Sequence, residues 1–283
     1  MEYRKGDRVR HPSKDDWGLG EVLANSNGDT VKIFFVGAGE RTIALKYAQP
    51  IKVSGDAAVH PVLDNLKISN SASGKYQSLL QSTKFFLDQF PEGFYGQRFN
   101  DEEREYKDKA HALALDLLGK EIFNYLLENN EYREIVRRAL KVVGATNLIF
   151  PNEKMSLKDG LFAEAAQKSF AFALYGLLFG EEELRPRFEA FAKVLNDIDA
   201  AKWTTASYFL FILEPGRYMF VKPTVTQYAS ERCGFEINYK PQINWLTYQS
   251  VLQFSNYLFS ELSELKPRDM IDVQSFMWCI VPR

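Results

Sequence analysis

The sequence predicts an α+β protein: a small N-terminal β-barrel over residues 1–53, followed by a larger, mostly α-helical domain over residues 75–283. Two observations predict it. Short β-rich runs separated by glycine turns fill the first fifty or so residues, and after residue 74 the spacing of apolar residues becomes helical. A chain of 283 residues, 46% hydrophobic and 25% charged, has the size and composition for one large domain with a small appendage.

Four short strands are expected in the barrel, near residues 6–12, 18–23, 30–36 and 41–45. Asn27-Gly28-Asp29 separates the second strand from the third. It is a hairpin signal, because Asn and Gly tolerate the positive φ angles of a type I′ turn. Several short twisted strands without a helix predict a sheet closed on itself.

Three segments of this region carry a resemblance to known modules: Gly6-Asp7-x-Val9-x-His11-Pro12, Trp17-Gly18-x-Gly20-x-Val22 and Val31-Lys32-Ile33-x-Phe35. They resemble the Tudor-like module at the C-terminus of UvrD-type repair helicases, and are also similar to the polymerase-binding module of CarD-type transcription factors. The resemblance implies an SH3/Tudor-like barrel that binds RNA polymerase, a repair factor or nucleic acid. The alternative is that any small barrel needs glycines at its corners.

A polar stretch rich in small residues, 54–74, is predicted to be a linker. Beyond it, apolar residues at helical spacing predict a series of helices. Asn100 is expected to cap the second of them, whose first turn is rich in acids. The expected helices span 75–90, 101–118, 120–144, 156–179, 187–195 and 248–262.

The composition excludes several classes of site. A net charge of −2 requires that any contact with nucleic acid come from a local patch. Cys233 and Cys279 lie far apart among apolar residues, which favours buried thiols in a reducing compartment. Three separated histidines and no Cys-x-x-Cys predict no metal site, and no cofactor is expected. No apolar run is long enough to span a bilayer, so a cytoplasmic protein without membrane contact is expected.

Two helical segments carry charged rows that can be interpreted in two ways. On residues 130–143, a cationic stripe opposite an apolar face is predicted to track DNA phosphates, with Arg8 and Arg10 of the barrel as further contacts. Glu131 and Glu134 leave a simple solvated face as the alternative. On residues 101–118, a row of ionisable groups could converge on one pocket for acid–base chemistry or form surface ion pairs. The stripe comprises Arg133, Arg137, Arg138 and Lys141, and the row Glu103, Arg104, Tyr106, Lys107 and His111.

The carboxyl-terminal third places two ionisable residues inside apolar runs. Lys222 follows a predicted turn at Glu214-Pro215-Gly216-Arg217, and desolvation there would favour an uncharged, nucleophilic amine. Asp272 lies between Ile271 and Val273, where a carboxylate is costly unless it is paired or functional. The alternative is a buried structural pair of Asp272 with Arg217 or Lys222.

The segment from Met219 to Ala229, followed by Gly234-Phe235 and a closing helix, resembles the end of helix-hairpin-helix DNA glycosylases. The sequence departs from that family in two ways: the Gly-x-Gly hairpin is missing, and Lys222 stands where the catalytic aspartate is usual. The resemblance implies Lys222 as the nucleophile or Asp272 as the stabiliser of the sugar cation, with aromatic residues stacking on a flipped base. The stacking residues would be Trp203, Tyr218 and Trp245, and the further contacts to substrate would come from Arg217, Gln227 and Gln274.

Two functions follow. The first is a DNA-binding, glycosylase-like enzyme that excises a damaged or modified base in repair or phage defence. The second is a non-catalytic adaptor that binds DNA or RNA polymerase through the barrel and another partner through its helices. A nucleotide-dependent enzyme or a nuclease is not expected, because the sequence lacks a phosphate-binding Gly-x-x-x-x-Gly-Lys-Ser/Thr loop and an acid cluster with metal-binding spacing.

Overall fold

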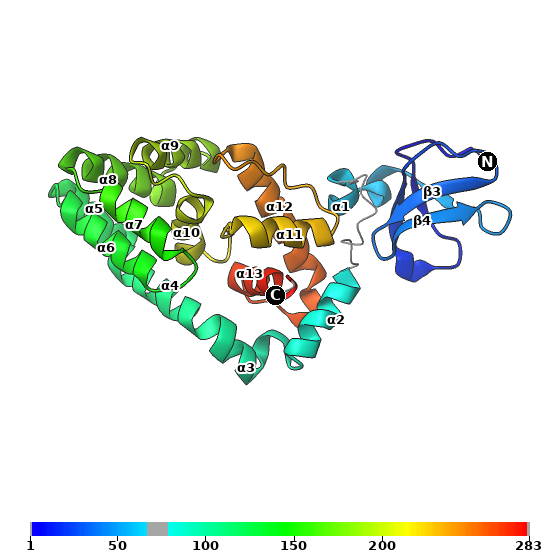
Figure 1. Cartoon of the computed structure of the whole chain (residues 1–283), viewed down its shortest axis with the longest axis horizontal. Helices are drawn as coiled ribbons and strands as arrows, with labels where there is room; N and C mark the ends of the chain where they lie inside the picture. The colour runs from blue at the N-terminus through cyan, green and yellow to red at the C-terminus, as the bar shows by residue number, and fades with distance from the viewer. Residues whose placement is uncertain (1, 67–78, 282–283) are drawn as a thin grey trace. The chain divides into compact units, whose positions relative to one another are not determined.

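A computed structural model describes residues 2–66 and 79–281. It shows an antiparallel sheet near the N-terminus and helices through most of the rest (Figure 1). The chain forms two compact units: Met1–Gln89 with Gln227–Ile237, and Phe90–Thr226 with Asn238–Arg283. Part of the expected linker, 67–74, and the first residues of the expected helix 75–90, up to 78, lie outside the described residues.

The first unit contains a five-stranded sheet in the order β4-β3-β2-β1-β5, with every neighbouring pair antiparallel. The expected closed barrel is wrong: the sheet stays open, with β4 and β5 at its two edges. The fifth strand was not predicted, since it has only three residues and pairs with β1 alone. The strands are β1 (Arg8–Arg10), β2 (Leu19–Val22), β3 (Thr30–Phe35), β4 (Gly39–Ala44) and β5 (Ile51–Val53).

Buried side chains form a core against the open sheet. Tyr3 is fully buried in the core of the sheet with Val9 and Ile33, and its hydroxyl donates to the carbonyl of Pro50 at 2.8 Å. Gly20 has a packing role, because a Cβ there would come within 2.6 Å of the Phe35 ring. The glycine-rich motif therefore lets the Phe35 ring lie directly on β2.

The turn between β2 and β3 differs from the type I′ prediction. Gly28 has φ +96°, but Asn27 does not have a positive φ. Instead, the Asn27 side chain accepts hydrogen bonds from the amides of Asp29 at 3.2 Å and Thr30 at 2.8 Å. The turn is therefore stabilised by the Asn27 side chain, and only Gly28 needs a positive φ angle.

Besides the sheet, the first unit holds two short 3₁₀ turns, η1 (Asp15–Trp17) and η2 (Gly55–Ala58), and the helices α1 (Pro61–Asp64) and α2 (Leu79–Gln89). The segment 227–237 reaches this unit through an amide of Glu236 that donates to the carbonyl of Asn65 at 2.7 Å. The boundary between the units falls within α11 (Pro223–Arg232).

The second unit is helical. Its helices are η3 (Gly93–Tyr95), α3 (Gln97–Phe99), the π-helical turn η4 (Asn100–Arg104), α4 (Glu105–Leu118), α5 (Lys120–Glu128), α6 (Tyr132–Gly144), α7 (Pro151–Gly160), α8 (Glu164–Phe179), α9 (Leu184–Asp197), α10 (Trp203–Leu213), α12 (Trp245–Glu261), η5 (Ser263–Leu265) and α13 (Met270–Cys279). The expected cap at Asn100 is wrong, because its φ of −58° and ψ of −49° are helical and it lies inside the chain of turns.

Several expected helices are shorter than predicted, and α10, α11 and α13 were missed. The stretch 120–144 breaks at Asn130, whose φ is +55°. The helices α10 and α13 were not predicted because they are apolar nearly all round, so they lack the one-sided period on which the prediction depends. All eleven residues of α10 are buried, which places this helix in the core.

Candidate functional site

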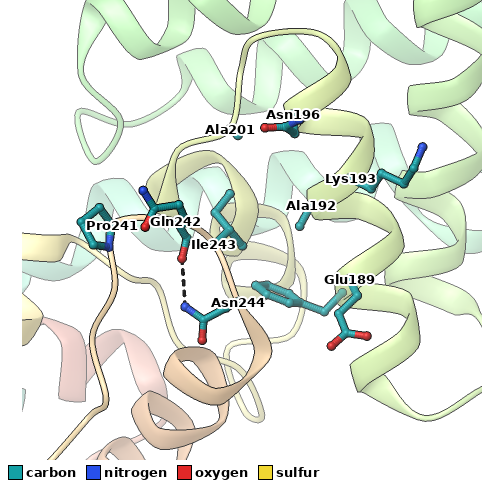
Figure 2. A pocket seen from close by; sticks show the side chains of 10 residues that line it. Glu189, Ala192, Lys193, Asn196, Ala201, Pro241, Gln242, Ile243 and Asn244 are labelled. Carbon is teal, nitrogen blue, oxygen red and sulfur yellow. Dashed lines mark hydrogen bonds between the residues drawn. The ribbon is translucent and has the colours of Figure 1, made fainter.

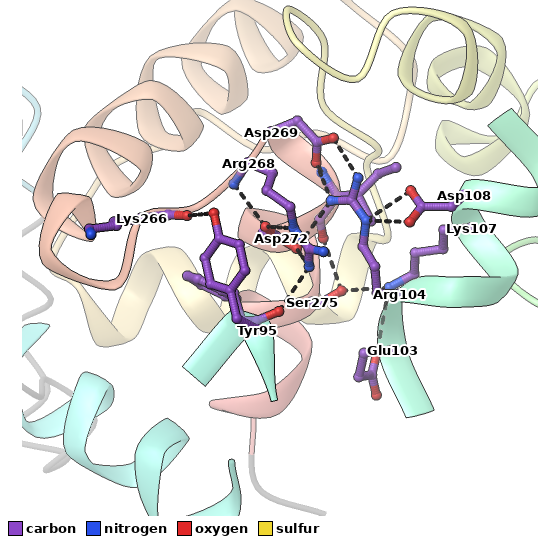
Figure 3. Close-up of polar contacts among 12 residues, drawn as sticks. Tyr95, Glu103, Arg104, Lys107, Asp108, Lys266, Arg268, Asp269, Asp272 and Ser275 are labelled. Carbon is purple, nitrogen blue, oxygen red and sulfur yellow. Dashed lines mark hydrogen bonds and ion pairs between the residues drawn. The ribbon is translucent and has the colours of Figure 1, made fainter. Parts of the chain in front are cut away.

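A buried cluster of charged side chains joins η4 and α4 to α13 (Figure 3). The guanidinium of Arg104 donates to Asp269 at 2.6 and 2.7 Å, to Asp108 at 2.8 and 2.9 Å and to Asp272 at 3.1 Å. Burial alone would lower the pKa of Arg104, but the hydrogen bonds to Asp269 and Asp108 raise it above its usual range. Arg104 therefore stays charged and ties three carboxylates to one point.

Asp272 lies inside this cluster and is fully buried. Both of its carboxylate oxygens accept bonds from the Arg268 side chain at 2.9 Å, and one also accepts from the Arg268 amide at 2.8 Å. The expected pairing with Arg217 or Lys222 is wrong, because Arg217 pairs with Glu214 at 3.2 Å. With its lone pairs occupied by Arg104 and Arg268, Asp272 acts as a structural anion that holds α13 in place.

The row predicted on residues 101–118 points partly into the interior. Lys107 is 1% exposed, and its ammonium donates to the hydroxyl of Ser275 at 2.7 Å and to Glu103 at 3.4 Å. Burial lowers the pKa of Lys107 to about 8, although the Glu103 carboxylate opposes this. At the end of the row, the His111 ring nitrogen Nδ1 lies 2.7 Å from the carbonyl oxygen of Ile212. The row therefore makes interior contacts.

Lys222 is in a different environment. Its ammonium lies 4.6 Å from the ring centre of Phe150 and 5.0 Å from that of Trp278. Half-buried, it forms no ion pair with a carboxylate of the described residues. Burial lowers the pKa of Lys222, and the charge of the nearby Glu153 partly offsets this. The side chain is thus a partly desolvated amine with two aromatic rings as its main counterparts.

The loop before α7 supplies half of this arrangement. Glu153 accepts from the amide of Phe150 at 3.1 Å and from the hydroxyl of Thr204 at 2.9 Å, which orients the start of α7. Phe150 is the N-cap residue of α7, and Pro151 is the first residue of that helix. The fold thus brings Phe150, at the start of α7, and Trp278 of α13 together around Lys222.

The aromatic residues proposed for base stacking are mostly used in the core. Trp203 is 3% exposed, donates its ring N–H to the carbonyl of Lys240 at 2.8 Å and packs on Phe188. Tyr218 is 5% exposed. Trp245 is half-buried and packs edge-on against Phe188. These contacts leave Trp203 and Tyr218 without a free face for a flipped base.

The two glutamines proposed as substrate contacts differ in burial. The carboxamide oxygen of Gln274, on α13, is buried and accepts no hydrogen bond from the residues that the structure describes. Gln227 is half-buried, and its carbonyl accepts from the hydroxyl of Ser230 at 2.9 Å.

A pocket of about 480 Å³ opens beside α9 and the segment that leads into α12 (Figure 2). No residue proposed from the sequence lines it. Its lining combines an apolar floor with carboxamide and charged side chains at the rim: Phe188, Glu189, Ala192, Lys193, Asn196, Ala201, Pro241, Gln242, Ile243 and Asn244. The pocket lies directly over the aromatic group formed by Phe188 with Trp203 and Trp245.

The predicted cationic stripe lies on α6 but is partly neutralised. Glu134 accepts from Arg137 at 2.6 Å and from Arg138 at 2.8 Å, and these two bonds lower the pKa of Glu134 to about 2. Arg133 and Lys141 are exposed. One carboxylate therefore holds two of the four cations of the stripe, Arg137 and Arg138. This favours the interpretation of the charged side of α6 as an ordinary solvated face.

The two arginines of β1, Arg8 and Arg10, also differ in whether they are paired with carboxylates. Arg8 forms ion pairs with Glu21 and, at 2.7 Å, with Asp64 of α1. Arg10 is exposed and forms no ion pair with the residues that the structure describes. Only Arg10 of this pair is therefore available to a ligand.

Within residues 2–66 and 79–281, no group of three or more His, Cys, Asp or Glu side chains is arranged to hold a metal ion. In the same ranges, no helix has the length and apolar character needed to cross a bilayer. Both cysteines are free and buried as expected, and burial raises the pKa of the Cys233 thiol to about 12. Cys233 is therefore protonated at neutral pH.

Comparison with protein families gives one match. The profile of the family described as "Protein of unknown function (DUF3553)" matches residues 3–53. Curated proteins and solved structures give no significant match to the chain. The matched segment ends at Val53, the last residue of β5, so the similarity covers the sheet and nothing beyond it. Residues 3–53 are called the sheet module below.

Two sets of residues were missed by the sequence prediction. Arg268 and Asp269 complete the charged cluster, and Asp269 caps α13 by accepting from the amide of Ile271 at 2.9 Å. An aspartate just before an apolar run is a cap signal that could have identified α13. The pocket residues carry no such signal, because they come from two segments about forty-five positions apart that meet only in the folded chain.

Proposed function

We propose that the protein is a non-catalytic adaptor that binds RNA polymerase or a repair factor through the outer edge of β4. An open sheet edge presents unpaired backbone N–H and C=O groups to which an extended segment of another protein can add as a strand. The observation that supports the proposal is the free edge of β4, a six-residue strand in the sheet module.

The hydrogen-bond pattern identifies which backbone groups of β4 face outward. The amide of Leu45 donates to the carbonyl of Asp29 at 2.8 Å, so residue 45 belongs to the set that faces β3. In an antiparallel ladder this set alternates, so Arg41 and Ile43 also face β3, while Glu40 and Thr42 face away. Glu40, Arg41 and Thr42 are all exposed.

The charge of the sheet module favours a protein over nucleic acid as the partner. From residue 1 to residue 53 the chain has nine Lys and Arg against seven Asp and Glu. Four of the cations, Arg4, Arg8, Lys32 and Lys52, are already in ion pairs with Glu or Asp. A nearly neutral surface gains little from counterion release on a phosphate backbone, and the resemblance to polymerase-binding modules agrees with a protein partner.

A proline at position 42 tests the proposal. The Thr42 amide faces outward, so Thr42→Pro removes a donor from the free edge without removing a bond to β3. We expect full-length Thr42→Pro to bind RNA polymerase at least about tenfold more weakly than the unchanged chain, measured by biolayer interferometry. Thr42→Val, which keeps the amide, should bind within about twofold.

Circular dichroism of Thr42→Pro is the control for retention of the fold. The adaptor proposal is wrong if the unchanged chain binds neither polymerase nor repair helicases. The β4 edge is excluded if Thr42→Pro binds as tightly as Thr42→Val. A duplex DNA control at two salt concentrations distinguishes a nucleic-acid ligand, whose affinity would fall steeply with salt.

A second candidate function is a glycosylase-like enzyme, and the observation that favours it is the partly desolvated amine of Lys222. Asp272 drops out of this candidate because Arg104 and Arg268 occupy its oxygens. Duplexes with damaged or glucosylated bases, treated with the protein and then alkali, should break at abasic sites. The breaks should vanish in Lys222→Ala and persist in Lys158→Ala, an exposed lysine on α7.

A further inference from the structure

We propose that the outward edge of β4 is selective and accepts an extended segment whose acidic residue pairs with Arg41. The inference rests on the adaptor function proposed above and names the chemistry of its partner. Arg41 lies in the middle of β4 and is exposed. Its guanidinium forms no ion pair with a carboxylate of residues 2–66 or 79–281. A carboxylate on an added strand complements a cation of this kind.

In the chain alone, Arg41 covers part of the β4 edge itself. Its guanidinium donates to the carbonyl of Glu40 at 2.9 Å. Glu40 is one of the residues whose backbone groups face away from β3, so this carbonyl is an acceptor that an added strand needs for one of its own amides. The guanidinium must therefore leave the Glu40 carbonyl before the full ladder can form. Charged side chains protect other free sheet edges in a similar way.

An aromatic platform holds the guanidinium beside β4. The central carbon of the Arg41 guanidinium, Cζ, lies 5.7 Å from the ring centre of Trp17. The Trp17 ring is half-buried and packs against the rings of His11 at 4.8 Å and Phe35 at 5.2 Å, which restricts its own movement. Stacking on this ring limits the rotamers of Arg41, so pairing with a carboxylate loses less side-chain entropy.

The register of β4 places the acid of the partner opposite Arg41. The amide and carbonyl of Arg41 face β3, so on the outward side residue 41 is a non-hydrogen-bonded position. In an antiparallel pair, side chains at such positions approach most closely, with Cα atoms about 4.5 Å apart. On the other face of β4, Glu40 is already paired with Lys32, and Thr42 is uncharged. Arg41 is therefore the residue of β4 that discriminates by charge.

Acidic and non-acidic partner strands differ in what replaces the broken Arg41 contact. A carboxylate opposite Arg41 replaces the bond to the neutral Glu40 carbonyl with an ion pair. A neutral side chain displaces the guanidinium without compensation, and a cationic one adds repulsion. The edge thus selects acidic strands by attraction and rejects others through the contact that they must break.

The test uses three short soluble peptides of alternating Thr and Val, identical except for a central Glu, Gln or Lys. They are titrated into the isotope-labelled full-length chain, and the amide signals of Glu40 and Thr42 report binding at the edge. The Glu peptide should bind at least about tenfold more tightly than the Lys peptide, with the Gln peptide between them. The difference should shrink at high salt, because salt screens exposed charges.

Arg41→Ala separates selection from binding. It removes the cation and uncovers the Glu40 carbonyl, so the Glu and Lys peptides should bind within about twofold of each other. The Gln peptide should bind more tightly to Arg41→Ala than to the unchanged chain. Arg10→Ala, which removes an exposed arginine from β1, is the matched control and should keep the preference of the unchanged chain. Retained dispersion of the amide signals is the control for folding.

The proposal is overturned if the unchanged chain binds the Glu and Lys peptides equally, if neither shifts these amides at millimolar concentration, or if Arg41→Ala keeps the preference. The adaptor function survives such a result when Thr42→Pro still weakens polymerase binding, so the two failures are distinguishable. Light scattering tests a second copy of the chain as the occupant. A dimer of the unchanged chain that is lost in Thr42→Pro would also overturn the proposal.

Discussion

Asp272 and Lys222 both lie in apolar stretches of the sequence, yet the fold gives them opposite surroundings. Asp272 is fully buried and is compensated by two guanidinium groups, those of Arg104 and Arg268. Lys222 is half-buried and is compensated mainly by the faces of Phe150 and Trp278. A buried charge whose hydrogen-bonding capacity is filled serves the fold. A cation such as Lys222, which contacts mainly aromatic faces, has a pKa that its surroundings can shift.

Within the second unit, the charged cluster around Asp272 therefore stabilises the fold, whereas Lys222 keeps an amine with a lowered pKa. The charged cluster connects η4, α4 and the start of α13, so its contribution should appear in stability. The Lys222 contacts involve a single cation at a partly exposed position, where cation–π attraction is worth about 0.5–1 kcal/mol. Mutations in the charged cluster should therefore change the free energy of unfolding severalfold more than mutations around Lys222. Mutations around Lys222 should instead change the pKa of its amine.

The largest expected effect comes from breaking the charged cluster. Arg104→Met removes the cation that Asp269, Asp108 and Asp272 share and leaves the fully buried Asp272 with Arg268 as its remaining cation. We expect the free energy of unfolding, measured by urea denaturation, to fall by about 3–5 kcal/mol.

Arg137→Met is the matched control for this prediction. Arg137 is exposed on α6 and also pairs with a carboxylate, Glu134, so its removal should change stability far less than the removal of Arg104. Equal losses in the two variants would show that the cluster around Asp272 has no special structural role.

The second effect is a dependence of stability on pH that originates at Lys107. Its folded-state pKa of about 8 is below the ordinary value of 10.5. The unfolded chain therefore binds more protons than the folded chain between these values, and stability rises with pH across that window. The contribution is fully present above pH 10.5 and is lost as the pH falls to about 8, at no more than about 1.4 kcal/mol per unit.

Lys107→Met isolates this contribution. Other groups titrate in the same range, Cys233 among them, so the informative quantity is the difference between the unchanged chain and the variant. The stability of the unchanged chain relative to Lys107→Met should increase from pH 8 to pH 10, measured by urea denaturation at fixed ionic strength. A difference that does not change with pH would mean that Lys107 titrates at its ordinary value in the folded protein.

The comparison also shows where sequence-based prediction succeeds. Alternating apolar residues and glycines located four of the five strands, because a strand with one buried face repeats every two residues. That the sheet stays open could not be predicted, since this depends on how Tyr3, whose hydroxyl donates to the carbonyl of Pro50, packs in the folded chain. The fully buried α10 was missed because it has no polar face to reveal its period.

The candidate site was predicted in part for the same physical reason. A carboxylate among apolar residues indicates that Asp272 needs a partner, but the sequence does not say which. Arg104 is 168 positions away and meets Asp272 only through the packing of η4 against α13. The carboxamides of the pocket are also brought together only by folding, and their sequence neighbours are ordinary surface residues.

The smallest and most specific effect concerns the chemistry of Lys222. Its pKa lies below the ordinary value of 10.5 because of burial, and the Glu153 charge limits the shift. Competitive acetylation across pH, read by mass spectrometry, should therefore give Lys222 a midpoint below 10.5, and Glu153→Gln should lower it further by removing that charge. The amide of Gln can still accept from Phe150 and Thr204, so the start of α7 should be retained. A midpoint unchanged by Glu153→Gln would mean that the carboxylate does not act on Lys222, and the two regions would then differ only in burial.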